Sequence, residues 1–338
     1  MENNKNEINR RKFISTTVKG ATVLAVSGLA SSCSVFTGDE KAQVPKRPLG
    51  KTGMNVSILS FGGGSQFMRN ENGQWEKMLE TAIKNGINLF DTAPNYRIVG
   101  PGGKNALRSE ERYGKVLSPY RSQIYYMTKL DIGNDGKRHP ETVRKSVEGS
   151  LKRLNTDYID ILLIHSINDK DTVGEIENGI YKEMIKLKEE GIIKHTGFSS
   201  MDSAEKSRDL LENLDFDVAM LAMNPTKYRG FADIALPVAK KKKVGVVTIK
   251  VLRGLIGKDA TAEELLEYVW TENHVSSAMI GHYGLNTLKE NIKLAIKNGK
   301  KNHLTVDKEA LENRLVAYAG PHALVWARPG YEDAGIVV

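Results

Sequence analysis

Four side chains of the kinds used in acid–base chemistry stand in the first half of the chain. They are Asp91, Tyr96, Lys129 and His165. A phenol can donate a proton when an ammonium lies beside it, because the positive charge stabilises the phenolate that is left behind. A carboxylate can hold the ammonium in place, and an imidazole can donate a hydrogen bond to a substrate oxygen. Each residue alone is more often solvated or structural, so the hypothesis requires a fold that brings all four together.

The pattern of apolar residues indicates the elements that must position these side chains. From Pro48 onward, short runs rich in β-branched residues alternate with amphipathic segments, which is typical of parallel βα units. The expected strands cover residues 56–61, 88–91, 124–128, 159–164, 195–198, 218–222, 244–249 and 276–280. The expected helices cover residues 74–85, 109–118, 140–154, 180–190, 203–214, 231–242, 262–273 and 285–298. Eight such units in about 250 residues predict an α/β fold, a closed (β/α)8 TIM barrel.

The alternative fold is a doubly wound open sheet. Such a sheet normally carries a Gly-x-Gly-x-x-Gly turn after its first strand, and the glycines at 62–64 lack that spacing. In a barrel, by contrast, chemistry lies at the carboxyl ends of the strands. Asp91, Lys129 and His165 end or follow three successive expected strands, so the barrel would bring them to one mouth.

Three segments of the sequence resemble the catalytic segments of the aldo-keto reductase family: 88–96 (NLFDTAPNY), 127–130 (MTKL) and 162–165 (LLIH). The resemblance extends over roughly residues 46–298. It implies an NAD(P)(H)-dependent oxidoreductase that reduces an aldehyde or ketone, or oxidises the alcohol, by hydride transfer. It assigns Tyr96 as the general acid, Lys129 as the cation that makes Tyr96 a better acid, and Asp91 as the partner of Lys129. His165 would orient the substrate oxygen, and no metal is expected.

The resemblance also implies the cofactor contacts. They correspond to Ser199, Ser200, Lys250, Leu252, Arg253, Gly281, Glu290 and Asn291. Two positions depart from the family pattern in the pocket for the nicotinamide carboxamide. Ser200 replaces an asparagine, and Met220 stands where a glutamine is usual.

The family usually binds NADP(H), and NAD(H) is the alternative here. Members specific for NADP often hold the 2′-phosphate with a lysine and an arginine, and Gly281 and Thr287 occupy these positions. The loss of charge-assisted partners predicts weak discrimination for the phosphate. His282 is a candidate for a substitute cation.

The first 45 residues have the layout of an export signal followed by a polar tether. Arg10 and Arg11 precede an apolar run at 21–30 and the single cysteine, Cys33. The arrangement resembles a twin-arginine signal and predicts a periplasmic protein, or a membrane-anchored lipoprotein if Cys33 is lipidated. The alternatives are an incidental Cys33 and a cytoplasmic protein.

The remaining predictions concern organisation and partners. Residues 46–300 would form the barrel, and residues 301–338 a C-terminal tail that packs on it or folds over the mouth. The long connection 97–108 is either a substrate loop or a variable insertion. The net charge of +8 is spread without a nucleic-acid-binding motif. We therefore expect a monomer with a small-molecule carbonyl or alcohol substrate, and no nucleic-acid partner. The alternative function is a nucleotide-binding, redox-sensing or partner subunit with little turnover.

Overall fold

A computed structural model of the chain describes residues 42–100, 103, 106–133, 135–299, 305–331 and 336–337. The predicted export signal, with Arg10, Arg11 and Cys33, lies outside the described residues. Within these ranges, no helix combines the length and the apolar character that a membrane span requires.

Eight parallel strands form a closed barrel in the order β10-β11-β3-β4-β6-β7-β8-β9. Their bounds are β3 (Leu59–Gly62), β4 (Leu89–Asp91), β6 (Tyr125–Leu130), β7 (Ile159–Ile167), β8 (Ile193–Ser200), β9 (Val218–Ala222), β10 (Gly245–Ile249) and β11 (Val275–Gly281). The barrel closes where β11 pairs with β3, with Ala278 opposite Leu59 and Gly281 opposite Gly62. The predicted (β/α)8 fold is confirmed.

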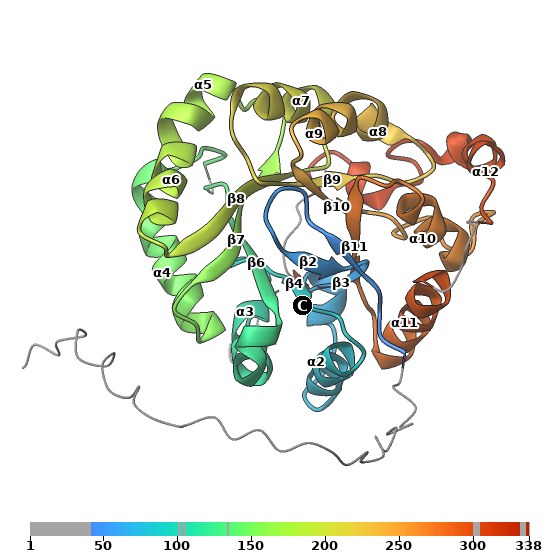
Figure 1. Cartoon of the computed structure of the whole chain (residues 1–338), viewed down its shortest axis with the longest axis horizontal. Coiled ribbons are helices and arrows are strands. Elements are labelled where there is room, and N and C mark those ends of the chain that lie inside the picture. Colours follow the sequence, from blue (N-terminus) through green and yellow to red (C-terminus); the bar gives the residue numbers. More distant parts are fainter. Residues whose placement is uncertain are drawn as a thin grey trace, which may run out of the picture. The chain divides into compact units, whose positions relative to one another are not determined.

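Helices surround the strands as a ring (Figure 1). They are α2 (Gln74–Lys84), α3 (Ser109–Leu117), α4 (Val143–Leu154), α6 (Lys182–Glu189), α7 (Ala204–Asn213), α8 (Phe231–Ile234), α9 (Leu236–Lys241), α10 (Ala262–Trp270) and α11 (Leu285–Gly299). Each buries one apolar stripe against the strands; in α2 the stripe is Trp75, Met78, Leu79 and Ala82. The single helix expected at 231–242 is wrong, because it is divided at Ala235, two residues before Pro237, which lacks a backbone N–H.

The strand expected at 56–61 is also divided. Its first part, β2 (Asn55–Ser57), pairs antiparallel with β1 (Lys46–Pro48), and only its second part, β3, enters the barrel. The strand is interrupted where two polar side chains form hydrogen bonds with the backbone. The Ser57 N–H donates to the Asn88 side chain at 2.8 Å, and the Asn88 N–H donates to the Ser57 hydroxyl at 3.2 Å. Side-chain hydrogen bonds thus take the place of strand pairing at this point.

Several shorter elements were not predicted from the pattern of apolar residues. They are α1 (Ser65–Met68), α5 (Val173–Ile176), α12 (Lys308–Leu315), β5 (Ile98–Val99) and β12 (Ile336–Val337). In the tail, Leu311, Leu315 and Trp326 are buried. The final strand β12 pairs in parallel with β5, with Ile336 opposite Ile98. The tail therefore joins the long connection that follows Tyr96.

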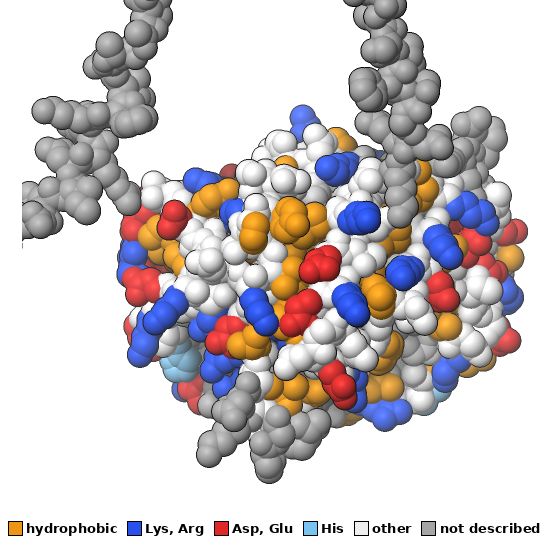
Figure 2. Space-filling view, turned by 90° about the horizontal axis from the view of Figure 1, so that it is seen from below, with side chains coloured by type: hydrophobic (Ala, Val, Ile, Leu, Met, Phe, Trp, Pro, Cys, Tyr) orange, Lys and Arg blue, Asp and Glu red, His pale blue; other side chains and the backbone are white. Residues whose placement is uncertain are grey.

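Charged side chains of both signs are mixed on the face shown in Figure 2. Lysines and arginines there alternate with aspartates and glutamates, separated by apolar and neutral groups. Positive charge is therefore not gathered into one continuous patch on this face, as contacts to a nucleic-acid backbone would favour.

Candidate active site

Three adjacent strands bring the four predicted catalytic residues together. Asp91 ends β4, Lys129 lies near the end of β6, and His165 lies toward the end of β7, while Tyr96 follows β4 in the next connection. None of the four is more than 5% exposed. The barrel therefore places titratable groups in a buried cluster at the carboxyl ends of its strands, as the sequence predicted.

Lys129 lies at the centre of this cluster. Its ammonium is hydrogen-bonded to the Asp91 carboxylate and donates to the Thr92 carbonyl at 2.8 Å. The Lys129 Nζ atom also lies 4.8 Å from the centre of the Tyr96 ring. A buried ammonium is costly unless it is paired, so these partners fix the charge beside the phenol.

The backbone carbonyl of Asp91 accepts two hydrogen bonds that fix its position. The Tyr113 hydroxyl donates to the Asp91 carbonyl at 2.9 Å, and the Gly63 N–H donates to the same oxygen at 2.7 Å. Burial, and secondarily the negative charge of Asp91, raises the pKa of Tyr113, so this phenol stays protonated and able to donate. A Cβ atom at Gly63 would lie 2.7 Å from the Asp91 carbonyl and 2.3 Å from the Ser109 hydroxyl. Only glycine allows this close approach.

Tyr96 is fixed at the base of the long connection 97–108. Its N–H donates to the Ala93 carbonyl at 3.1 Å, and its own carbonyl accepts from the Ser109 N–H at 2.9 Å. The connection therefore leaves and returns beside Tyr96. Its described strand β5 is tied to the tail.

Asp131 is a site residue that the sequence reading missed. Its carboxylate lies 2.7 Å from Nδ1 of His165, and the His165 ring meets the Tyr96 ring edge to face at 5.9 Å. The other ring nitrogen, Nε2, is buried and has no hydrogen-bond partner among the described residues. The spacing of Asp131 from Lys129 could have indicated this role. Residues two apart in a strand face the same side of the sheet, and Asp131 follows Lys129 by two residues.

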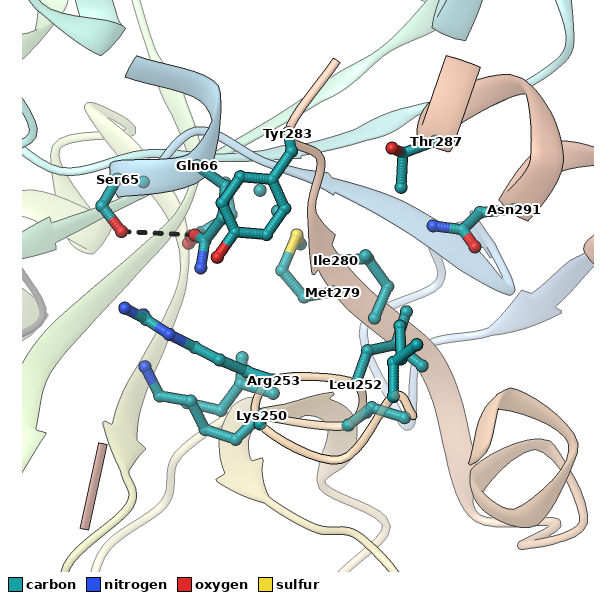
Figure 3. Close-up of a pocket in the computed structure, with 18 of the residues that line it drawn as sticks. Ser65, Gln66, Lys250, Leu252, Arg253, Met279, Ile280, Tyr283, Thr287 and Asn291 are labelled. Atoms are coloured by element: carbon teal, nitrogen blue, oxygen red, sulfur yellow. Dashed lines mark hydrogen bonds between the residues drawn. The ribbon is translucent and has the colours of Figure 1, made fainter. Parts of the chain in front are cut away.

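A cavity opens beside Asp91 and Tyr96, between the ends of β3, β10 and β11 (Figure 3). Five of the residues predicted to contact a cofactor line it: Lys250, Leu252, Arg253, Gly281 and Asn291. Three others do not line it: Ser199, Ser200 and Glu290. The Ser199 hydroxyl accepts from the Ser166 N–H at 2.9 Å, and the Ser200 hydroxyl donates to the Ile167 carbonyl at 2.9 Å. Ser200 thus ties the end of β8 to the end of β7.

The two cations of the cavity meet the C-terminal tail. The Tyr331 hydroxyl lies 3.3 Å from Lys250 Nζ and is hydrogen-bonded to Arg253. Both cations also lie over the Tyr331 ring, 5.0 and 5.1 Å from its centre. The tail therefore covers the cationic side of the cavity.

The opposite wall was not predicted from the sequence. Ser65 and Gln66, from the short helix α1, lie across the cavity from Lys250 and Arg253, and Tyr283 stands at the rim (Figure 3). Tyr283 is 63% exposed. Since α1 has only four residues and no periodic pattern, its contribution depends on the barrel that carries it.

His282 is not a substitute cation, contrary to the sequence-based expectation. Its ring is fully buried against Phe61, 5.4 Å between ring centres, and its Nδ1 is 3.3 Å from the Asn291 amide. Burial lowers the pKa of His282 to about 3. The imidazole is therefore neutral near pH 7 and cannot pair with a phosphate.

A family model, Aldo/keto reductase family, matches residues 59–303. Aldo-keto reductase YhdN of Bacillus subtilis is 30% identical over 241 residues, which are 66% of this chain and 67% of that protein. L-galactose dehydrogenase of Arabidopsis thaliana is 32% identical over 163 residues, 47% of this chain. The chain spans about half the length of this second relative, 49%.

A solved structure is similar over most of the barrel. The crystallised putative aldo-keto reductase of Pseudomonas aeruginosa matches with a TM-score of 0.63 and 29% identity, over 77% of this chain and 98% of that one. The range matched by the family model, residues 59–303, includes the strands that carry the buried cluster.

The burial of His282 predicts a pH-dependent stability. Below pH 6.5 the unfolded chain binds a proton at this ring that the folded chain does not bind until about pH 3, so the free energy of unfolding decreases as the pH falls through this window. One such group costs about 3 kcal/mol between pH 7 and pH 4. We expect His282→Leu to flatten this slope in urea unfolding, whereas the exposed control His322→Asn leaves it unchanged. Identical slopes for wild type and His282→Leu would contradict the assignment.

Proposed function

Because the chain belongs to the aldo/keto reductase family, we propose that it is an NAD(P)(H)-dependent oxidoreductase that reduces a small aldehyde or ketone, or oxidises the corresponding alcohol. One observation carries the proposal. The buried Lys129 ammonium is held by Asp91 and lies 4.8 Å from the ring of Tyr96, beside an open cavity. This arrangement suits a phenol that must donate a proton at neutral pH.

Tyr96 acts as the general acid in the direction of reduction. Its hydroxyl proton passes to the substrate oxygen as the alkoxide develops, and the Lys129 ammonium stabilises the phenolate that remains. Asp91 keeps the ammonium in place through a direct hydrogen bond. His165 lies against the Tyr96 ring and offers its unengaged Nε2 to the same substrate oxygen. In alcohol oxidation the proton moves in the opposite direction.

The cavity fits a dinucleotide in its charge and in its open space. Lys250 and Arg253 can hold a pyrophosphate once Tyr331 yields its place on them. A Cβ atom at Gly64 would lie 3.6 Å from the Tyr96 ring, so the missing side chain leaves room beside the phenol. When bound there, the nicotinamide supplies or accepts the hydride. Asn291 also lines the cavity and would contact the adenosine.

The proposed cofactor is NADP(H), which the family usually binds, and NAD(H) is the alternative. Gly281 brings no side chain to the cavity, Thr287 brings a neutral one, and His282 is neutral and buried. With these three positions uncharged, the usual cations for a 2′-phosphate are missing, and discrimination against NAD(H) is weak.

The place of action is proposed from the first 45 residues alone. A twin-arginine signal exports folded proteins, and a barrel that binds its dinucleotide before export would carry it across the membrane. Dinucleotide is scarce outside the cytoplasm, so such an enzyme would retain it and alternate between oxidising one substrate and reducing another. A lipid at Cys33 would attach the protein to a membrane. We propose a monomer.

Replacement of Tyr96 by phenylalanine tests the proton donor. We expect Tyr96→Phe to bind reduced dinucleotide normally but to lose carbonyl reduction by about 10²–10⁴-fold, the usual contribution of general acid catalysis. Steady-state turnover with a panel of aldehydes and ketones provides the measurement, and Tyr120→Phe, at an exposed tyrosine, is the matched control. Full turnover in Tyr96→Phe would refute the assignment. A wild-type protein that binds dinucleotide without turnover would favour the partner-subunit alternative.

A comparison of the two reduced cofactors tests the 2′-phosphate site. Because no cation lies at Gly281, His282 or Thr287, we expect the Kd values of NADPH and NADH to differ by less than about a thousandfold, or about 4 kcal/mol. Fluorescence titration gives both values. A larger preference for NADPH would show that another cation binds the phosphate.

Purification of the exported form tests the place of action. We expect mature protein outside the cytoplasm to contain bound dinucleotide when it is purified without added nucleotide, and to release it slowly. The double variant Arg10→Lys, Arg11→Lys should remain inside the cell. Exported protein that is empty of dinucleotide and binds it only weakly would overturn the proposal of retained cofactor.

A further inference from the structure

We propose that Asp131 is a positioning residue that fixes one proton of His165 on Nδ1, so that Nε2 of the neutral ring presents a lone pair to the substrate oxygen. This inference rests on the proposed oxidoreductase function. It concerns a residue outside the tyrosine, lysine, aspartate and histidine set on which that function was argued.

The first support is the contact between the two side chains. Asp131 Oδ1 lies 2.7 Å from His165 Nδ1. An ionised carboxylate can only accept hydrogen bonds, so Nδ1 must carry the proton that joins them. The His165 side chain is 5% exposed, while that of Asp131 is 25% exposed. The carboxylate thus keeps some solvation while it holds a ring that has almost none.

The second support is that the ring has little freedom to turn. Arg138 donates to the His165 carbonyl at 2.8 Å, and this arginine is held by Asp171 through two hydrogen bonds, at 2.7 and 2.9 Å. On the other side, the ring packs edge to face against Tyr96. Both the backbone and the ring of His165 are therefore held by neighbouring elements. Nε2 is left as the buried nitrogen that no described residue engages.

With Nδ1 protonated, the character of Nε2 depends on a second proton. In the neutral ring Nε2 has a lone pair and accepts from the O–H of an alcohol; in the doubly protonated ring it donates to a carbonyl oxygen. Asp131 therefore leaves Nε2 of the neutral ring as an acceptor, and donation to a carbonyl oxygen is reserved for the ring that carries both protons.

Other charged groups near the ring largely offset one another. They are Lys129, which is paired with Asp91, and Arg138, which is paired with Asp171. Tyr96 is the titratable group in contact with the ring itself. Asp131 is thus the carboxylate hydrogen-bonded directly to the imidazole, and its removal should change which ring nitrogen carries the proton more than any other single substitution in this set.

The position of the proton can be measured without catalysis. In protein labelled with ¹⁵N-histidine, we expect the neutral His165 of the wild type to carry its proton on Nδ1. In Asp131→Leu the neutral ring should carry a substantial share of its protons on Nε2, because the acceptor is gone. Asp135→Asn, at an exposed carboxylate in the same loop that pairs with His139, is the matched control and should leave His165 unchanged. The same tautomer in wild type and Asp131→Leu would overturn the proposal.

The effect on the reaction follows from the same contact. Asp131→Asn keeps an oxygen acceptor for the Nδ1 proton, whereas Asp131→Leu removes it. We expect kcat/KM to fall about tenfold in Asp131→Leu, the usual worth of one such hydrogen bond, and to stay close to wild type in Asp131→Asn. Equal losses in the two variants, with the tautomer unchanged in both, would reduce Asp131 to a structural role. Failure of the Tyr96→Phe test would instead remove the proposed reaction and leave the tautomer measurement standing.

Discussion

The buried ammonium of Lys129 constrains the arrangement of its neighbours at the end of the barrel where the strands have their carboxyl ends. Lys129 is 1% exposed, and a charge so far from water is tolerated only when partners compensate it. Those partners, Asp91 and the Thr92 carbonyl, come from the neighbouring strand β4 and the residue that follows it. Gly63 and Tyr113 then fix the backbone of Asp91 in turn. The ammonium is thus compensated only when β4 and β6 are paired, which ties the electrostatics beside Tyr96 to the integrity of the fold.

Strand β6 connects the ion pair with β4 to a second polar pair with β7. Its Lys129 pairs with a carboxylate on β4, and Asp131, just after its end, pairs with the imidazole on β7. The alternation of a strand places both side chains on one side, two residues apart. Acidic and basic groups therefore alternate across three adjacent strands, and the rings of Tyr96 and His165 meet between the two pairs. Each charged group therefore has a hydrogen-bonded partner, so the cluster can be buried without leaving one of them unpaired.

Sequence reasoning predicted what depends on local pattern and missed what depends on contact. Apolar periodicity located the eight barrel strands, because each must bury its side chains between the barrel interior and the helices. It failed at 56–61, where Ser57 and Asn88 exchange hydrogen bonds, and at 231–242, where Pro237 divides a helix. Gln66 and Tyr331 could not be assigned, since both reach the cavity only through the folded barrel. The burial of His282, which decides its charge, was likewise invisible in the sequence.

The cavity lies across the seam where the barrel closes. One wall comes from β3 and α1, near the start of the described chain, and another from β11, near its end. At the same seam, the hydroxyl groups of Ser60 and Ser277, 217 residues apart, are hydrogen-bonded. Contacts of such sequence separation form late in folding, because a long loop must first be ordered. A chain that has formed most of its βα units would still lack a binding groove. Dinucleotide binding would therefore count only molecules whose first and last barrel strands have met, and it would report completed folding more strictly than helix content does.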